Sequence, residues 1–458
     1  MRAAEVCGRG RMRGMHADAR ETKAQPTAGR TWLLCAGALL FLCLRTPYEF
    51  IHGMVYDEEG TVYLRYAWDA TVRHALLAPH QGYYSLFANG CGVVAARVVP
   101  LEQAGHFLFG AEIAVQLLMV WMVVECERFA GVWQKLLAVA IALLTPPTSA
   151  IVLSTIHGQF FLAVMTAAIL ISDAERLRWA RLAALGLAGL TGVTSCLLLP
   201  LFVWQAWRER ARDRPQRMDA RKAQVAVLGV CAVVQALVIL TQPRDFHGTH
   251  STLRFYAGAL LSNGVMDHFF TSWSYVEVCK AVGSPKLRNL QELFWLAVEG
   301  VSALYLAVTA WLAWRSGRAA RLMAAAALLS LAASFSRSLV VNMDLMCGSG
   351  GRYFVIFNIL TGLSLVLVSQ NTRGLSALAA RVLIACCLWS GARELEYIAI
   401  HPHLPVWSQQ VAAWRADPAR GIAVRPGYWP DVKLTREPGN RDLPANIYDT
   451  NQPGWRDR

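Results

Sequence analysis

The chain has 458 residues, of which 55% are hydrophobic and only 16% are charged. A soluble protein of this length would form two or three cores and carry far more charge on its surface. The formal net charge of +13 would suit nucleic acid, but the Arg and Lys residues lie mainly in short loops between apolar runs, where they orient a membrane protein. The composition therefore disfavours both a soluble enzyme and a nucleic-acid-binding protein.

The apolar residues come in runs that are nearly free of charge. Runs near 20 residues can cross about 30 Å of hydrocarbon as a helix. Backbone polar groups cannot stay unpaired in lipid, and the runs do not alternate as barrel strands do, so we expect helical spans. The runs are Trp32–Leu44, Ala111–Val124, Ile151–Ile171, Val225–Leu240, Phe294–Trp314, Leu322–Ala333, Phe354–Val368 and Leu375–Trp389.

The sequence predicts no structural metal site. Its eleven cysteines include no CxxC pair and no His/Cys cluster. His247, His250 and His268, which lie in a predicted external segment, also lack the spacing of metal ligands.

The first part of the chain predicts a cytoplasmic tail, one span and a long external loop. Residues 1–30 are polar and rich in arginine, which keeps such a tail on the cytoplasmic side. The first span covers about 31–50 and exits to the far side. The loop that follows, about 51–103, is aromatic and then semi-apolar, so we expect one or two helices lying along the membrane interface.

The middle of the chain predicts short and broken helices. A second span, about 104–124, returns inward, and the next pair of helices is separated by an external turn at Thr145-Pro146-Pro147-Thr148, because proline ends helices. Residues 182–207 are apolar but interrupted near Gly192, and basic segments flank them on both sides. This pattern favours a hairpin of two short helices, which is tolerated at membrane depth where protein surrounds it.

The last part predicts more spans, a second external loop at about 242–292 and an external extension. Residues 393–458 hold no apolar run and form that extension. The transmembrane domain therefore covers 31–392, and the fold class is an all-α polytopic membrane protein with about eleven helices. The expected late spans are 223–241, 293–314, 322–341, one that begins after Tyr353, and 375–391.

Three adjacent carboxylates, Asp57-Glu58-Glu59, follow the exit of the first span. Like charges beside a lipid surface are unfavourable for one another, so a site that needs them is one explanation. A carboxylate near a low-dielectric wall has a raised pKa, which suits a general base that deprotonates a hydroxyl group. We predict Asp57 or Glu58 as this base, and a metal ligand or the solvated start of a loop are the alternatives.

A glycine-rich loop, Gly348-Ser349-Gly350-Gly351, presents Arg352 and Tyr353 where an inward span begins. A guanidinium group can hold a phosphate through two parallel hydrogen bonds. Arg337, towards the outer end of its span, is predicted to pair with a carboxylate or a phosphate. These three residues are candidates for substrate binding, and the alternative for Arg352 is a side chain that reaches to the interface.

Two tyrosines and one histidine complete the set of candidates. Tyr83 and Tyr84 in the first external loop suit stacking on a sugar ring, although an interfacial aromatic belt has the same composition. His157 follows the Pro-Pro turn. It either lines the reaction cavity or is a packed, hydrogen-bonded residue.

In this arrangement the chain resembles the GT-C-fold membrane glycosyltransferases, which take a sugar from a polyprenyl-phosphate carrier on the external face. The resemblance rests on the acidic opening of a long first loop, the many short spans, Arg352-Tyr353 before a late span, and the small external C-terminal part. It implies that Asp57 and Glu58 hold the place of the catalytic acidic residue, which acts as the base, and that Arg352 holds the carrier phosphate. The acidic site here is a triplet without a second acidic motif, so the use of a divalent metal is left open.

The resemblance implies a glycosyltransferase, transferring a hexose or pentose, in the bacterial inner membrane, with a cytoplasmic N-terminus and a periplasmic active site. Its partners would be a polyprenyl-phosphate sugar donor, a lipid-linked or cell-envelope glycan acceptor and the lipid bilayer, with no nucleic acid. One alternative is a transporter or flippase of lipid-linked saccharides, which would need charged residues deep in the spans. Another is a polysaccharide polymerase or ligase.

Overall fold

The chain is almost entirely helical. Its computed structural model describes residues 28–56, 58–147, 151, 154–211, 215–241, 253–269, 291–338, 349–398, 406–424 and 431–443. Within these residues there is no β-strand, only three isolated bridges. The prediction of an all-α fold is confirmed.

Several helices are long enough and apolar enough to cross a membrane. The described residues hold five of them, or six if one sharply bent pair forms a single span. This bears out the prediction of an all-α membrane protein, whereas the predicted count of eleven spans is not confirmed. The five are α7 (Ala104–Val124, extended by the short helix η3, Leu101–Gln103), α13 (Pro215–Thr241), α17 (Gln291–Ser316), α18 (Arg318–Ser338) and α21 (Leu375–Ile398).

Two shorter apolar helices form the centre of the bundle. In α20 (Val355–Asn371) every residue from Val355 to Val368 is buried, and α9 (Gly158–Ile171) is buried along nearly its whole length. A helix that is apolar on all sides must be surrounded, and α20 contacts α8 (Val132–Leu144), α9, α17, α18 and α21. The residues predicted as the first span form α2 (Ala28–Arg45), which packs against α7, and then a separate short helix that begins at Pro47. Helix α2 is not among the five long apolar helices.

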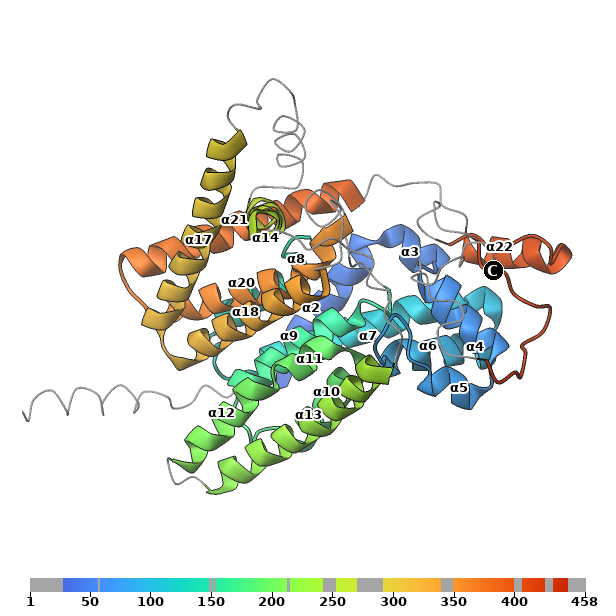
Figure 1. Cartoon of the computed structure of the whole chain (residues 1–458), viewed down its shortest axis with the longest axis horizontal. Coiled ribbons are helices and arrows are strands. Elements are labelled where there is room, and N and C mark those ends of the chain that lie inside the picture. The colour runs from blue at the N-terminus through green and yellow to red at the C-terminus, as the bar shows by residue number, and fades with distance from the viewer. Residues whose placement is uncertain are drawn as a thin grey trace, which may run out of the picture.

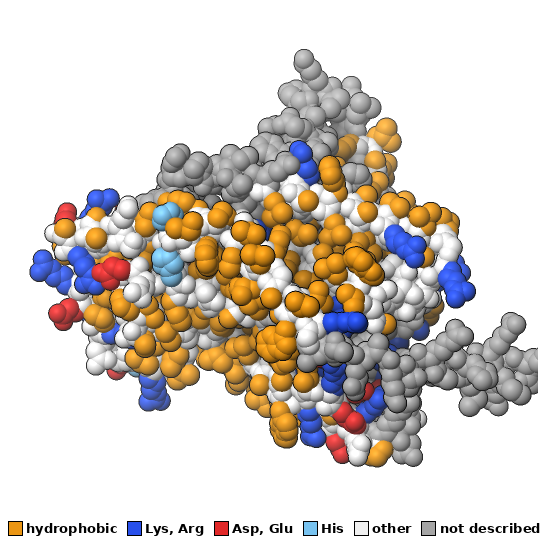
Figure 2. Space-filling view, turned by 180° about the vertical axis from the view of Figure 1, so that it is seen from behind, with side chains coloured by type: hydrophobic (Ala, Val, Ile, Leu, Met, Phe, Trp, Pro, Cys, Tyr) orange, Lys and Arg blue, Asp and Glu red, His pale blue; other side chains and the backbone are white. Residues whose placement is uncertain are grey.

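The outer helices turn apolar side chains outward. Val230 on α13 is 66% exposed and Leu304 on α17 is 63% exposed. Figure 2 shows hydrophobic side chains gathered over the middle of one face, with most charged side chains nearer its edges. Such a surface suits a lipid environment because exposed apolar area of this extent is unfavourable in water.

The interrupted segment at 182–207 is a broken helix, as predicted. Helices α10 (Arg178–Thr191) and α11 (Val193–Leu197) meet at Gly192, and α12 (Leu199–Arg210) follows α11 after Leu198. The direction of the chain bends by 116° between α10 and the α11–α12 segment. The long helix α13 packs against α10, α11 and α12, which surrounds the break with protein (Figure 1).

The first predicted external loop differs from its prediction of one or two interfacial helices. It holds a series of short helices that bury a core of their own, with Tyr66, Trp68 and Leu108 in it. These helices lie with α22 (Trp407–Ala416) at the right of Figure 1. They are α3 (Pro47–His52), the π-helix η2 (Glu59–Leu64), α4 (Arg65–Asp69), α5 (Val72–Leu77) and α6 (Leu86–Arg97).

The C-terminal segment is fastened to these short helices. Arg97 donates hydrogen bonds to the carbonyl oxygens of Trp68 at 2.8 Å and Gly439 at 2.7 Å, and Trp407 donates to the carbonyl oxygen of Leu101 at 2.7 Å. Since α21 continues to Ile398, the predicted domain boundary at 392 falls inside a helix rather than after one.

Part of the predicted second external loop belongs to the bundle. Residues 253–269 form α14 (Leu253–Ala259), η5 (Leu260–Met266) and α15 (Asp267–Phe269), and Leu260 and Phe269 join the main core. The hydroxyl of Ser390 on α21 donates to the carbonyl oxygen of Asp267 at 2.7 Å. This helical segment therefore packs inside the bundle instead of covering it. His268 is fully buried there, and His247 and His250 lie outside the described residues.

Candidate functional site

A buried carboxylate begins the π-helix η2. Glu59 is only 1% exposed, and its Oε1 accepts hydrogen bonds from the backbone N–H of Thr155 at 2.8 Å and from the Thr155 hydroxyl at 2.5 Å. Its Oε2 accepts one bond, from the backbone N–H of Tyr56 at 3.2 Å. Burial raises the pKa of the Glu59 carboxyl to about 7, and the hydrogen bonds from Thr155 and Tyr56 oppose that rise.

The turn at 154–158 joins this carboxylate to a histidine. His157 lies immediately before α9, and its ring stacks on Phe160 with centroids 5.7 Å apart. Burial, and next the positive charge of Arg352, lower the pKa of His157 to about 3, so the ring is neutral at physiological pH. Its Nδ1 is buried and has no hydrogen-bond partner in the described part of the chain.

Arg352 lies beside the Pro-Pro turn, close enough for its charge to act on His157. It lies in the short 3-10 helix η7 (Ser349–Tyr353) directly before α20, with its guanidinium 5.2 Å from the centroid of the Tyr353 ring. A side chain at Gly351 would come within 2.9 Å of Pro147, so a residue without a side chain lets η7 approach the Pro-Pro turn. The amide of Asn358 fixes this junction by donating to the carbonyl oxygen of Pro146 at 2.9 Å.

A second buried carboxyl faces the turn from α7. Glu112 is fully buried, and its Oε1 accepts a 3.3 Å hydrogen bond from the amide of Gln116. A side-chain carbon placed at Gly158 would lie 3.0 Å from Oε2 of Glu112, so the carboxyl reaches the backbone of the turn. We call Glu59, Glu112, Thr155, His157 and Arg352 the acidic site.

The predicted tyrosines border this site. The amide of Gln159 donates to the Tyr83 hydroxyl at 2.9 Å, and Gln235 on α13 exchanges two hydrogen bonds with the backbone of Tyr84 at 3.1 and 2.9 Å. Tyr83 is 3% exposed and Tyr84 is 8% exposed, so protein covers both rings in this structure. Their role in sugar binding stays a prediction.

Some predicted residues lie outside what the structure describes. Glu58 is described and buried, whereas Asp57 and Asp344 are not among the described residues. Arg337 belongs to the last turn of α18, but its side chain is outside the described part. The structure therefore brings Glu59 into contact with the turn at 154–158 and places the charge of Arg352 within reach of His157. The place of Asp57, Glu58 and Arg337 in that site stays a prediction.

Three members of the acidic site, Glu59, Glu112 and Thr155, are not predicted as site residues from the sequence. Glu112 carried a usable signal, because it is a lone carboxylate inside an otherwise apolar run. The sequence marks Glu59 only as the third of three adjacent carboxylates. Its burial depends on the C-terminal segment, since Val424 and Val432 pack at the neighbouring Gly60. A pattern of neighbouring residues cannot identify a contact between Gly60 and valines that lie more than 300 residues later in the chain.

The described residues contain no group of three or more His, Cys, Asp or Glu side chains arranged to hold a metal ion. The acidic site itself offers two carboxyls, Glu59 and Glu112, and the thiol of Cys91 nearby. Burial, and next the charges of Glu59 and Glu112, raise the pKa of this thiol.

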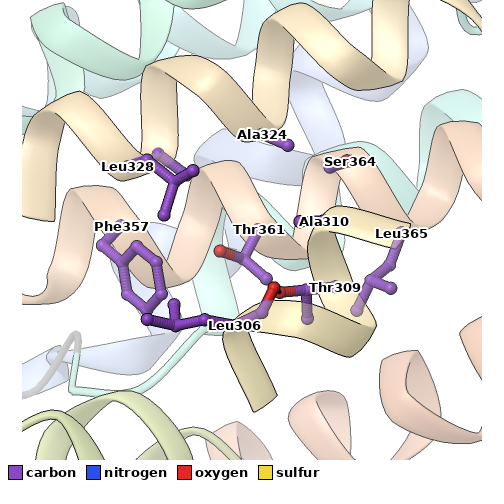
Figure 3. A pocket seen from close by; sticks show the side chains of 10 residues that line it. Leu306, Thr309, Ala310, Ala324, Leu328, Phe357, Thr361, Ser364 and Leu365 are labelled. Atoms are coloured by element: carbon purple, nitrogen blue, oxygen red, sulfur yellow. Dashed lines mark hydrogen bonds between the residues drawn. The ribbon is translucent and has the colours of Figure 1, made fainter. Parts of the chain in front are cut away.

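A hollow lies between α17, α18 and α20 (Figure 3). It is separate from the acidic site, because no residue of the acidic site lines it. Its lining is mainly apolar. The hydroxyls of Thr309 and Ser364 already donate to backbone carbonyls, those of Tyr305 at 2.8 Å and Ala320 at 3.1 Å. This hollow suits apolar atoms and offers no charged group to a phosphate.

Comparisons of the chain with protein-family models, with curated proteins and with solved structures find no match in any of the three.

Proposed function

We propose that the chain is a GT-C-type membrane glycosyltransferase that moves a sugar from a polyprenyl-phosphate carrier to a lipid-linked or cell-envelope glycan acceptor. The observation that supports this proposal is that a buried carboxylate and an arginine meet one turn. Glu59 accepts hydrogen bonds from Thr155. The positive charge of Arg352 lowers the pKa of His157, which lies two residues after Thr155 in the same turn. Such a pairing provides one group for a proton and another for a phosphate.

In the proposed reaction, a carboxylate of the Asp57-Glu58-Glu59 triplet takes the proton of the acceptor hydroxyl. The acceptor oxygen then forms a bond to the anomeric carbon of the sugar. The bond between that carbon and the carrier-phosphate oxygen breaks, and its electron pair leaves with the phosphate. Arg352 holds the phosphate and stabilises the negative charge that develops on it.

Asp57 and Glu58 are the bases predicted from the sequence. We add Glu59 as a third candidate base because its hydrogen bonds leave one carboxylate oxygen able to accept a proton. Its Oε1 has two hydrogen-bond donors, but Oε2 has only the N–H of Tyr56 and retains a lone pair for a proton. With a pKa of about 7, Glu59 is partly ionised at neutral pH and can still accept a proton readily.

The test compares purified Asp57→Asn, Glu58→Gln and Glu59→Gln variants in transfer from a panel of polyprenyl-phosphate sugars. The variant that removes the base should lose roughly 10²–10⁴ in rate, the usual contribution of general base catalysis, while it melts like the wild type. Wild-type turnover in all three variants would remove the triplet from the reaction, and no transfer by the wild-type protein with any donor would contradict the enzyme proposal.

On this proposal the acidic site faces the periplasm of a bacterial inner membrane. The basic turns at the other ends of α9 and α20 then face the cytoplasm, as the distribution of positive charge in membrane proteins requires.

One observation favours a second candidate, a proton-coupled transporter or flippase of lipid-linked saccharides. Glu112 is a carboxyl inside a helix that is long and apolar enough to cross a membrane, and such residues are characteristic of proton pathways. Purified protein in liposomes separates the candidates. A transporter moves a labelled lipid-linked saccharide across the bilayer under a pH gradient, and its transport stops in Glu112→Gln, whereas a transferase forms a new glycosidic bond without a gradient.

A further inference from the structure

Glu112 is an uncompensated carboxyl in the interior of the bundle. It is the ninth residue of α7, it is 0% exposed, and its Oε2 has no hydrogen-bond partner in the described part of the chain. No charged group in the described part of the chain forms an ion pair with it, and its one hydrogen bond there comes from the neutral amide of Gln116 on its own helix. An ionised carboxylate in such a place would lose its hydration without compensation.

Glu59 and Glu112 face the same short turn. Thr155 donates to Glu59, and Gly158, three residues later, lies against Oε2 of Glu112. The two carboxyls therefore approach one turn, Glu59 from η2 and Glu112 from α7. On the neighbouring helix α6, burial and next the charges of Glu59 and Glu112 raise the pKa of the Cys91 thiol.

The remaining charged groups on elements packed against α7 do not occupy this interior position. They stand at the ends of their helices or in the short helices at the edge of the bundle, and α9 contributes none. They are Arg30 and Arg45 of α2, Glu49 of α3, Arg97 of α6, Glu102 of η3 and Lys135 of α8.

Two carboxylates this close in a low-dielectric interior do not both ionise readily, because desolvation and mutual repulsion act on each of them. The charge is more stable on the carboxyl with more hydrogen-bond donors. Glu59 has three recorded donors, two from Thr155 and one from Tyr56, whereas Glu112 has one at 3.3 Å.

We propose that Glu59 and Glu112 form a two-carboxyl proton site that carries one negative charge, with the charge on Glu59 and the proton on Glu112. When Glu59 gains a proton, the repulsion between the two groups ends and Glu112 can release its own. The site therefore holds one proton at rest, two protons once Glu59 is protonated, and one again after Glu112 has released its own. This inference does not depend on the proposed glycosyl transfer, because a proton site of this kind serves a transferase and a transporter equally.

The first measurement is labelling of the purified full chain in detergent with a hydrophobic carbodiimide, which reacts with protonated carboxyls, followed by peptide mass spectrometry. At pH 7 we expect labelling of Glu112. Glu125 is the matched control, because it is also buried on the end of α7 but is paired with Arg176 and bonded by Thr31, and it should stay unlabelled. In Glu59→Gln, the pH at which half of Glu112 is labelled should fall by about one unit, since the repelling charge is gone.

The second measurement keeps the test independent of reagent access. The infrared carbonyl stretch of a protonated carboxylic acid at pH 7 should lose one component in Glu112→Gln and keep it in Glu125→Gln. Loss of that component supports the proposal even without labelling. The proposal is overturned if Glu112→Gln leaves the band unchanged, or if Glu59→Gln leaves the titration of Glu112 where it was. Glycosyl transfer is not measured in either experiment, so a failure here leaves the proposed function to its own test.

Discussion

The two ends of α9 carry buried charge in opposite ways. We call its C-terminal end the arginine end. There Arg221 donates hydrogen bonds to the carbonyl oxygens of Ile169 and Ser172. Arg128 donates to the carbonyl oxygen of Ile171 at 3.1 Å. At its N-terminal end, in the acidic site, Glu59 receives hydrogen bonds from neutral donors only and Glu112 receives one from an amide. At the arginine end the guanidinium groups bond to backbone carbonyls and to carboxylates, although the Nε of Arg221 has no hydrogen-bond partner among the described residues. At the acidic end neither carboxyl forms an ion pair in the described part of the chain.

The comparison separates a structural use of charge from a chemical one. Guanidinium groups at the end of a helix satisfy carbonyls that have no intrahelical partner and complement the helix dipole. Further ion pairs close the arginine end, including Arg176 with Glu125 and Arg217 with Asp173 at 2.8 Å. Carboxyls without a counter-charge destabilise the fold, and such groups are typical of sites that bind protons or substrates.

The largest expected effect is on the activity of a topology reporter, because we expect the acidic end and the arginine end to lie on opposite sides of the membrane. A periplasm-dependent alkaline phosphatase fused after Asn446, in the C-terminal part that includes the segment docked at the acidic end, should be active. The same reporter fused after Arg210, at the arginine end, should be inactive, while a cytoplasmic reporter works there. The reverse pattern would invert the proposed orientation, and equal activity at both sites would show that the two ends lie on one side.

Breaking the arginine end should cost stability. Arg221→Met leaves three neutral acceptors without their donor. A buried polar group left unsatisfied costs about 1–3 kcal/mol, so we expect a loss of at least that size, seen as a lower melting temperature in detergent. Lys222→Met is the matched control, because that side chain is 61% exposed and makes only a 3.5 Å surface pair with Asp219. If both variants melt alike, the buried arginine is not structural.

A smaller effect is expected at Arg352, and on activity rather than stability. Arg352→Lys keeps the charge but loses the two-pronged geometry, so use of the sugar donor should fall roughly 10- to 100-fold, the value of one charged hydrogen bond, with melting unchanged. Arg73→Lys, an exposed change in the same end of the molecule, should have no effect. Full activity in both Arg352→Lys and Arg352→Ala would remove Arg352 from phosphate binding.

The smallest effect is a dependence on pH that belongs to the acidic site alone. The pKa of Glu59 is raised to about 7, and a general base acts when it is deprotonated, so the rate should rise with pH up to about 7 and level off above it. Below that value the rate should fall about tenfold for each pH unit. The residual activity of Glu59→Gln should lack this inflection. An inflection that stays near pH 7 in Glu59→Gln would assign it to another group.

Features that depend on neighbouring residues were predictable from sequence. The break near Gly192, the end of α8 before the Pro-Pro turn and the start of α20 after Arg352-Tyr353 all appear as expected. Glycine and proline act within one helical turn, so their effect does not depend on the rest of the fold.

Features that depend on distant partners were not predictable in the same way. Helix α13 begins at Pro215 instead of about 223, because the basic residues that argue against a buried helix are satisfied there, Arg221 by carbonyls of α9 and Arg217 by Asp173. Likewise, residues 253–269 are predicted to belong to an external loop, yet Asn358 donates to the carbonyl oxygen of Asn263 at 2.8 Å and ties the segment into the bundle. Both outcomes depend on long-range contacts that a hydropathy pattern does not contain.

The attachment of the C-terminal segment sets an order of events in the making of the protein. Tyr66 donates to the carbonyl oxygen of Leu443 across a separation of 377 residues, and Trp407 donates to that of Leu101 across 306. The ribosome therefore finishes the helices near Glu59 long before it makes the residues that cover them. Until residues 407–443 have been synthesised and moved to the same side of the membrane, the core around Trp68 is incomplete and Gly60 lacks the valines that pack on it. The packing at Gly60, the neighbour of Glu59, is therefore completed only as one of the last steps in the biogenesis of the chain.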